Sequence, residues 1–459
     1  MRFSLTASCV LTAFIPLAAV AQDSDDDAAI ERGKYLATAA DCTACHGIDF
    51  AGGDPIASPI GNIYASNITP DANTGIGAWN ENDFADALRK GRAPGKGWLF
   101  PAMPYTSYTG LSDDDVAALY AYFQSIPAVE NSVQETDLGF PFVRPAMMAW
   151  NLLNLDEGHP VGAIDVTGDA ATNGRFLVET LGHCTACHTP RDALMGERDD
   201  MHLSGAMVDG WHAPNITPDD SGIGQWSDAD LAAYLQTGHN AIAVAGGKMA
   251  VAVEHSLSKL PDDDIADIGA YLREVPAIAT AEVPPPLAEA PAVSLAVLQK
   301  SSIDWQTQVD DAATDGAQLY QGACASCHGM DGVGLLGPDL VVTNDIRTPE
   351  ANNLVQVIAH GISVTTQGKT TLMPGFRDEM SDAQIAAVTN YTRTTFGGID
   401  SGIDAANVNA ILDGTGDAPW LIRNAFWLSI VGIAVAALLL IAVLIWATGR
   451  LRNRNASHG

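Results

Sequence analysis

The sequence reads CTACH at residues 42–46, CTACH again at residues 184–188 and CASCH at residues 324–328. CxxCH is the pattern by which a chain attaches haem c: two thiols form thioether bonds to the vinyl groups, and the adjacent histidine ligates the iron. A single match is also compatible with a redox-active CxxC pair or half of a zinc site. Three matches in one chain predict three covalently bound haem c groups.

The cysteine count supports the same interpretation. The chain has 7 cysteines, and all except Cys9 lie in the three frames. An even number of cysteines in an exported chain ordinarily indicates disulfides, but here the frames use every cysteine that remains once an N-terminal signal is removed. We therefore expect no disulfide. The cysteines predicted to hold haem are Cys42, Cys45, Cys184, Cys187, Cys324 and Cys327.

The frames recur about 140 residues apart, so the surrounding unit should repeat as well. An amphipathic helix is predicted before each frame, and a second helix with an apolar stripe is predicted after it. Ser381 and Gln384 add a capping box to the start of the last helix. The predicted helices are residues 31–40, 173–182 and 315–322 before the frames, and 112–126, 261–275 and 381–395 after them.

Two helices packed beside a planar porphyrin suit a small c-type haem domain. We therefore predict an all-α fold: three tandem class I cytochrome c-like domains followed by one C-terminal transmembrane helix. The predicted domains are residues 28–127, 169–276 and 313–398, separated by linkers at residues 128–168 and 277–312.

The two linkers differ in composition. Residues 277–312 are rich in Pro and Ala and should be extended and fairly stiff. Residues 128–168 contain an apolar segment that is unsuited to lying free in water, so we expect it to pack across domains or against a partner. The apolar side chains in question are Phe140, Phe142, Met147, Met148 and Trp150.

Both ends of the chain indicate export. Residues 1–21 resemble a cleaved secretory signal peptide, with a short apolar run that ends in small residues. Residues 425–448 carry no charge and, at ~1.5 Å per residue, are long enough to cross a bilayer core of ~30 Å. Arg450, Arg452 and Arg454 follow this run. Because basic residues stay on the cytoplasmic side, we predict a single-pass protein on the periplasmic face of the bacterial inner membrane, with a cytoplasmic C-terminus.

The overall charge excludes one class of function. The 459 residues include 55 Asp and Glu against 23 Lys and Arg, a formal net charge of -32. Nucleic-acid binding draws its affinity from basic residues that neutralise phosphates, so we expect no nucleic-acid partner. The sequence also lacks a Ser/His/Asp set, a phosphate-cradling glycine loop and an HExxH motif. We therefore predict no catalytic residue in this chain.

The second axial ligand decides whether a haem carries electrons or binds small molecules. One methionine precedes the second helix of each unit at a comparable distance, and a thioether ligand suits an electron carrier. Met207 and His255 compete with Met249 in the second unit, and His255 would give a bis-histidine haem of lower potential. Met380 is expected to be a core residue. The predicted iron ligands are His46 with Met103, His188 with Met249, and His328 with Met373.

Several longer stretches resemble the three-haem cytochrome c subunits of membrane-bound bacterial dehydrogenases that act on alcohol, fructose, gluconate, sorbitol or aldehyde. The stretches are GHCTACHTPR at residues 182–191, MAVAVEHSLSKL at 249–260, PFVRPAMMAWNLL at 141–153 and YQGACASCHGMDGVG at 320–334. The resemblance spans residues 31–396. It departs from the family at Lys248, where a Pro is usual, and at residues 337–340.

The resemblance implies a function for the chain. Members of this family take electrons from a catalytic dehydrogenase subunit, of flavin, quinoprotein or molybdenum type, and pass them to ubiquinone in the membrane. Their methionines at the positions of Met103, Met249 and Met373 complete the iron coordination. The C-terminal helix is similar to that of the fructose dehydrogenase type. Two alternatives stay open: a haem enzyme with one open face, of peroxidase or thiosulfate dehydrogenase type, and an electron donor to a terminal oxidase.

Overall fold

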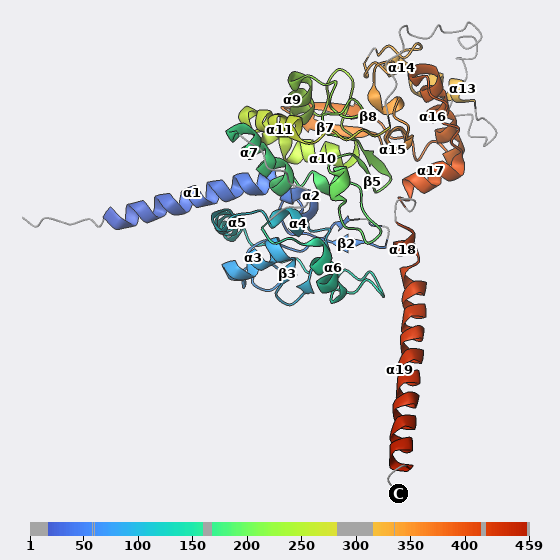
Figure 1. The fold of residues 1–459 in the computed structure, drawn as a ribbon. Helices are drawn as coiled ribbons and strands as arrows, with labels where there is room; N and C mark the ends of the chain where they lie inside the picture. The colour runs from blue at the N-terminus through green and yellow to red at the C-terminus, as the bar shows by residue number, and fades with distance from the viewer. Residues whose placement is uncertain are drawn as a thin grey trace, which may run out of the picture.

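The computed structural model describes residues 17–56, 58, 60–158, 168–281, 315–334, 336–414 and 419–456. Most of the predicted signal peptide and nearly all of the second linker lie outside these residues. The described chain forms a helical body from which the first part of helix α1 (Leu17–Ala39) and the whole of helix α19 (Ala425–Ala456) project (Figure 1).

Three helix pairs form the framework of the body, and each pair joins the helix before a CxxCH frame to the helix after it. The pairs are α1 (Leu17–Ala39) with α5 (Asp113–Ser125), α7 (Asp169–Arg175) with α11 (Asp262–Glu274), and α13 (Gly316–Ala323) with α16 (Asp382–Gly397). Helices thus occur before and after each frame as predicted, and the Ser381 and Gln384 capping box is confirmed.

One glycine lies at the crossing point of each helix pair. A Cβ atom on Gly33 would lie 2.0 Å from the Ala118 carbonyl oxygen, and one on Gly174 would lie 1.9 Å from that of Asp267. On Gly316 it would lie 2.2 Å from a backbone oxygen of α16. The two helices of each pair therefore approach as closely as they do because the first helix has no side chain there.

The second unit departs from the predicted continuous helix. Residues Phe176–Leu181 form one π-helical turn, η1, directly after α7. Such turns are rare and occur often at functional sites. The wider turn ends where the Gly182 amide donates to the Leu177 carbonyl oxygen, two residues before Cys184.

The fold is predominantly helical but not purely so, because short antiparallel strand pairs occupy several connections. In the described residues these pairs are β1 (Pro55–Ile56) with β2 (Ile63–Tyr64), β3 (Arg92–Ala93) with β4 (Gly97–Trp98), β5 (Ala206–Val208) with β6 (Trp211–Ala213), and β7 (Ile362–Thr366) with β8 (Lys369–Met373). The prediction of an all-α fold omitted them, because strands of two to five residues leave little periodic signal.

Short helices fill the remaining connections. The haem frames contain α2 (Cys42–His46), α8 (Thr185–His188) and α14 (Ala325–His328). The others are α3 (Glu81–Lys90), α4 (Tyr105–Tyr108), α6 (Ala146–Asn154), α9 (Asp228–Thr237), α10 (Gly247–His255), α15 (Asn352–His360), α17 (Ala405–Leu412) and α18 (Trp420–Arg423), with 3₁₀ turns η2 (Asp199–Met201), η3 (Leu257–Lys259) and η5 (Asn344–Ile346).

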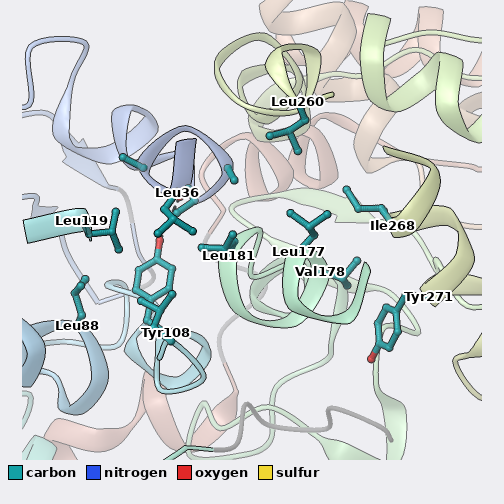
Figure 2. Close-up of a cluster of buried hydrophobic side chains, with 14 of the residues drawn as sticks. Leu36, Leu88, Tyr108, Leu119, Leu177, Val178, Leu181, Leu260, Ile268 and Tyr271 are labelled. Atoms are coloured by element: carbon teal, nitrogen blue, oxygen red, sulfur yellow. Dashed lines mark hydrogen bonds between the residues drawn. The ribbon is translucent and has the colours of Figure 1, made fainter. Parts of the chain in front are cut away.

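The first and second units share one hydrophobic core. Figure 2 shows Leu36 and Tyr108 of the first unit on one side of Leu181, and Leu177 and Tyr271 of the second unit on the other. The third unit has a core of its own. A small cluster joins the second and third units, formed by Ala245, Ala250, Val253 and Val364.

The first linker packs across the two units on one side only. The Trp150 Nε1 group donates to the Leu194 carbonyl oxygen at 2.9 Å, and its ring stands edge-on to Tyr105. Phe142 and Met147 are half-buried, but Phe140 and Met148 are exposed. The expected packing across units is therefore confirmed for one face of the segment.

The projecting C-terminal helix is α19 (Ala425–Ala456). Its residues Ala425–Thr448 have a mean hydropathy of 3.1, and this span is long and apolar enough to cross a membrane. The body of the protein buries none of this stretch. The coarse prediction of one apolar C-terminal helix is confirmed.

Candidate haem sites

The first CxxCH frame forms the short helix α2, which begins after Asp41 in the left-handed region at φ 46°. His46 Nδ1 lies 2.6 Å from the Ser66 carbonyl oxygen. A carbonyl oxygen only accepts, so Nδ1 carries the proton and donates, and the Nε2 lone pair remains for a metal. Burial lowers the pKa of His46, which favours the neutral ring that a metal requires.

The same arrangement recurs in the other two frames. His188 Nδ1 lies 2.7 Å from the Pro214 carbonyl oxygen, and His328 Nδ1 lies 3.2 Å from that of Pro338. Burial lowers the pKa of both histidines. Anchoring a histidine through its second nitrogen is how proteins orient a metal-ligating ring.

The His328 ring also requires a neighbour without a side chain. A Cβ atom on Gly337 would lie 2.6 Å from His328 Cε1. Gly337 is the first of residues 337–340, where the sequence differs from the pattern that is usual in the subunits it resembles. The departure therefore includes a residue that contacts the third histidine.

In the described residues no disulfide joins the six cysteines of the frames. Burial is the largest cause that raises the pKa of Cys42, Cys184 and Cys324 to about 12. Paired, protonated thiols one turn apart beside a neutral histidine fit the covalent attachment of haem c.

Each predicted methionine ligand packs against the core cluster that its own frame contacts. Met103 follows β4 and lies against the shared core, as Cys42 does. Met249, on α10, lies against the same core as Cys184. Met373 ends β8 and lies against the third core, as Cys324 does. These placements are compatible with the predicted ligand pairs.

The competing residues lie elsewhere in the second unit. His255 ends α10, six residues after Met249, which separates the two side chains by about 120° around the helix and ~9 Å along it. Its Nδ1 is buried and has no hydrogen-bond partner among the residues that the structure describes. Met207 lies in β5 opposite His212. Met380 is 3% exposed in the third core, as expected.

A buried polar cluster beside the second frame was not anticipated from the sequence. Glu179, in η1, is 1% exposed and accepts hydrogen bonds from Tyr271 Oη at 2.5 Å and His202 Nε2 at 2.9 Å. After burial, its charge is the next cause that raises the pKa of Cys184. The available signal was a glutamate inside the apolar run FLVETL at residues 176–181.

Helix α10 connects all three units. It contacts α2 of the first unit and β7 of the third, and Ser256, directly after it, donates to the Ala39 carbonyl oxygen at 3.2 Å. The helix that carries Met249 thus touches the first CxxCH frame, and the second unit connects the other two.

Comparisons with known proteins agree with this geometry. Residues 30–127 match the family model described as cytochrome c, and residues 311–391 match that of cytochrome c oxidase, cbb3-type, subunit III. The fructose dehydrogenase cytochrome subunit of Gluconobacter japonicus is 39% identical over 93% of this chain and 92% of its own length. The chain belongs to the family of dehydrogenase cytochrome c subunits.

Other members of this family are similar over comparable lengths. The gluconate 2-dehydrogenase cytochrome c subunit of Pantoea cypripedii is 38% identical over 83% of this chain and 89% of its own. The cytochrome c subunit of the quinone alcohol dehydrogenase of Gluconobacter oxydans (strain 621H) is 33% identical over 93% and 91%. Membership in the family implies covalently bound haem c and a role in electron transfer.

Proposed function

We propose that this chain binds three haem c groups and serves as the membrane-anchored electron-transfer subunit of a periplasmic dehydrogenase complex. The observation that carries the proposal is the threefold recurrence of a neutral histidine, directly after paired thiols, with Nδ1 bonded to a carbonyl oxygen and Nε2 free. The proposed iron ligands are His46 with Met103, His188 with Met249, and His328 with Met373. Haem c, when bound, supplies reversible one-electron transfer at its iron.

The chain's own residues support transfer between units. Helix α2, which holds Cys42 and Cys45, contacts α10 of the second unit, and the His183 ring, directly before Cys184, stands edge-on to Tyr108 of the first unit at 5.8 Å between ring centroids. The first two attachment sites therefore lie near each other. Because the second unit contacts both neighbours, we propose that electrons cross it on their way between the first and third units.

The proposed partner is a catalytic dehydrogenase subunit, and the proposed acceptor is ubiquinone. The relatives named above are subunits of fructose, gluconate and alcohol dehydrogenases, which supports a partner of flavin, quinoprotein or molybdenum type. Residues 425–448 would cross the inner membrane with the C-terminus in the cytoplasm, because Arg450, Arg452 and Arg454 follow the span.

The test uses the holoprotein, purified with the catalytic subunit that co-isolates with it. We expect three haems per chain, all low-spin and unreactive with carbon monoxide, and reduction of added ubiquinone when the dehydrogenase substrate is supplied. A high-spin haem that binds carbon monoxide in the native chain would instead indicate a haem enzyme. Electron delivery to an oxidase without quinone reduction would also contradict the proposal.

A further inference from the structure

Helix α6 of the first linker buries a polar residue, Asn151, and exposes three apolar ones, Met148, Leu152 and Leu153. Asn151 is 7% exposed; its side chain accepts from Tyr105 Oη at 2.8 Å and donates to the Lys90 carbonyl oxygen at 3.2 Å. Leu152 and Leu153 are 82% and 71% exposed. A surface helix in water shows the opposite pattern, so the outer face of α6 is suited to an apolar environment.

The exposed apolar residues form one group, called here the linker patch. It comprises Phe140, Val143, Met148, Leu152 and Leu153, all of which are exposed. Several exposed large apolar residues within one short segment are typical of a protein or membrane contact.

The linker patch is almost without charge in a strongly acidic chain. Residues 138–155 contain one charged side chain, Arg144. Its guanidinium lies over the Phe100 ring, 5.0 Å from the centroid, and donates to the Trp98 carbonyl oxygen at 3.2 Å. The Arg144 guanidinium, the only charged group of residues 138–155, therefore packs against the body and does not lie beside the linker patch.

The patch is continuous with the apolar C-terminal helix. The Phe140 ring lies 6.5 Å from that of Phe426, the second residue of α19, at an interplanar angle of 82°. Trp427 follows and is 68% exposed. Figure 1 shows α6 at the lower edge of the body, near the point where α19 projects from it. The patch thus lies at the level where a membrane-spanning α19 would enter the bilayer.

We propose that the linker patch inserts into the boundary between headgroups and acyl chains of the outer leaflet and gives the protein a second membrane contact beside α19. This inference rests on the proposed membrane anchoring. Amphipathic helices lie in this boundary with their apolar face buried ~5–10 Å. Contact at two points, α6 and α19, would hold the first unit against the membrane and prevent the body from swinging about one helix.

The test measures the depth of a nitroxide label in full-length holoprotein reconstituted into phosphatidylcholine and phosphatidylglycerol vesicles. Because the six frame cysteines would carry haem and Cys9 would be removed with the predicted signal peptide, the substitution L152C adds a single free thiol. Asp114, exposed in the first turn of α5, supplies a water reference as D114C. Leu439, 63% exposed in α19, supplies a lipid reference as L439C. Unchanged haem spectra establish that each variant is folded.

We expect the ratio of oxygen to water-soluble nickel accessibility to be severalfold higher at residue 152 than at residue 114. Adding L153E should return the ratio at residue 152 toward the water value. Equal ratios at residues 152 and 114, with residue 439 in lipid, would overturn the patch insertion but keep the anchor. A water-like ratio at residue 439 would instead overturn the anchoring itself.

Two further outcomes would also overturn the inference, because they assign the patch to a protein. In the first, the label at residue 152 is shielded from both reagents only when the catalytic subunit is present. In the second, labels on two copies of the chain broaden each other's spectra, and the broadening disappears on dilution with unlabelled protein.

Discussion

His46, His188 and His328 each donate from Nδ1 to a backbone carbonyl, and the acceptors lie 20, 26 and 10 residues further along the chain. The sequence identifies these histidines, because the CxxCH pattern is local. It does not identify the acceptors, since they belong to loops of different length. The hydrogen bond decides which nitrogen faces the iron, so the chemistry of each site depends on a contact that the motif omits.

Met249 and His255 give the sharpest test at this scale. Substitution of Met249 by alanine should convert one haem of the three to a high-spin form that binds carbon monoxide, because the thioether ligand is lost. His255→Ala should leave the spectrum unchanged, since the two side chains lie about 120° apart on α10. Visible and near-infrared spectra check both results. The opposite outcome would assign His255 as the ligand of the second haem.

Gly337 allows a second test. In Gly337→Ala the new methyl group would collide with the His328 ring, 2.6 Å away, and should tilt it out of its hydrogen bond to Pro338. We expect a lower midpoint potential or partial high-spin character in the third haem alone, measured by redox titration. Gly432→Ala in α19, where no atom lies within 4 Å of the new Cβ, is the matched control. An unchanged redox titration in Gly337→Ala would show that the loop around residue 337 moves while the His328 ring keeps its position.

At the scale of elements, the three helix pairs share one packing feature, a glycine where the two helices cross. Gly33, Gly174 and Gly316 each bring the first helix onto the backbone of the second. Glycine costs up to about 1 kcal/mol in a helix interior relative to alanine. Its presence at the same place in three helices is therefore explained by packing, because any larger residue would force the helices apart.

Gly174→Ala should destabilise the second unit by about 3 kcal/mol, because its Cβ would lie 1.9 Å from the Asp267 carbonyl oxygen in a tightly packed crossing. Gly269→Ala, in the partner helix α11, meets only Leu231 at 3.7 Å and should be neutral or stabilising. Thermal unfolding followed at the haem absorption band compares the two variants. Equal melting temperatures would mean that the helices can separate at little cost.

At the scale of the whole molecule, the units are joined in two different ways. The first and second share a continuous hydrophobic core. The second and third meet through a small apolar cluster and polar contacts, including reciprocal hydrogen bonds between the Asn353 side chain and the His212 backbone at 2.8 and 3.0 Å.

Asp345 lies at this junction. Burial raises its pKa from 3.8 to about 6. The pKa of Tyr234 in the second unit is raised mainly by burial and, after that, by the charge of Asp345. A carboxyl whose pKa is higher in the folded state binds its proton more tightly there. Its contribution to stability is therefore greatest below pH 3.8 and is lost as the pH rises to about 6.

Asp345→Asn should remove this loss and stabilise the third unit at neutral pH by about 1–3 kcal/mol. This range is the free energy that corresponds to the shift in the Asp345 pKa, reduced because the side chain is partly exposed. Urea midpoints measured from about pH 4 to 8 check the prediction. The variant should show a smaller decline between pH 4 and 6 than the parent. Asp378→Asn, an exposed carboxylate in the same unit, is the control, and an identical slope in both variants would refute the assignment.

The sequence by itself determined the features whose physical cause is local. CxxCH is covalent chemistry within five residues, the helices follow from apolar periodicity, and the C-terminal span follows from the length of an uncharged run. Because the CxxCH frames recur, the same local patterns predicted two helices in each of three units. Short strands such as β5 and the π-helical turn η1 were not predicted. Each spans only a few residues, which is too short to show a periodicity different from that of the neighbouring helices.

Only the tertiary structure decided how the units meet. Tyr35 donates to Asp264 from 229 residues away, and Ser256 donates to the Ala39 carbonyl from 217 residues away. Such contacts depend on which surfaces are complementary after each unit has folded, and no local pattern encodes this. The same reason applies to α6, whose apolar face is informative only because the structure leaves it exposed and places Phe140 of the same linker against Phe426 of α19.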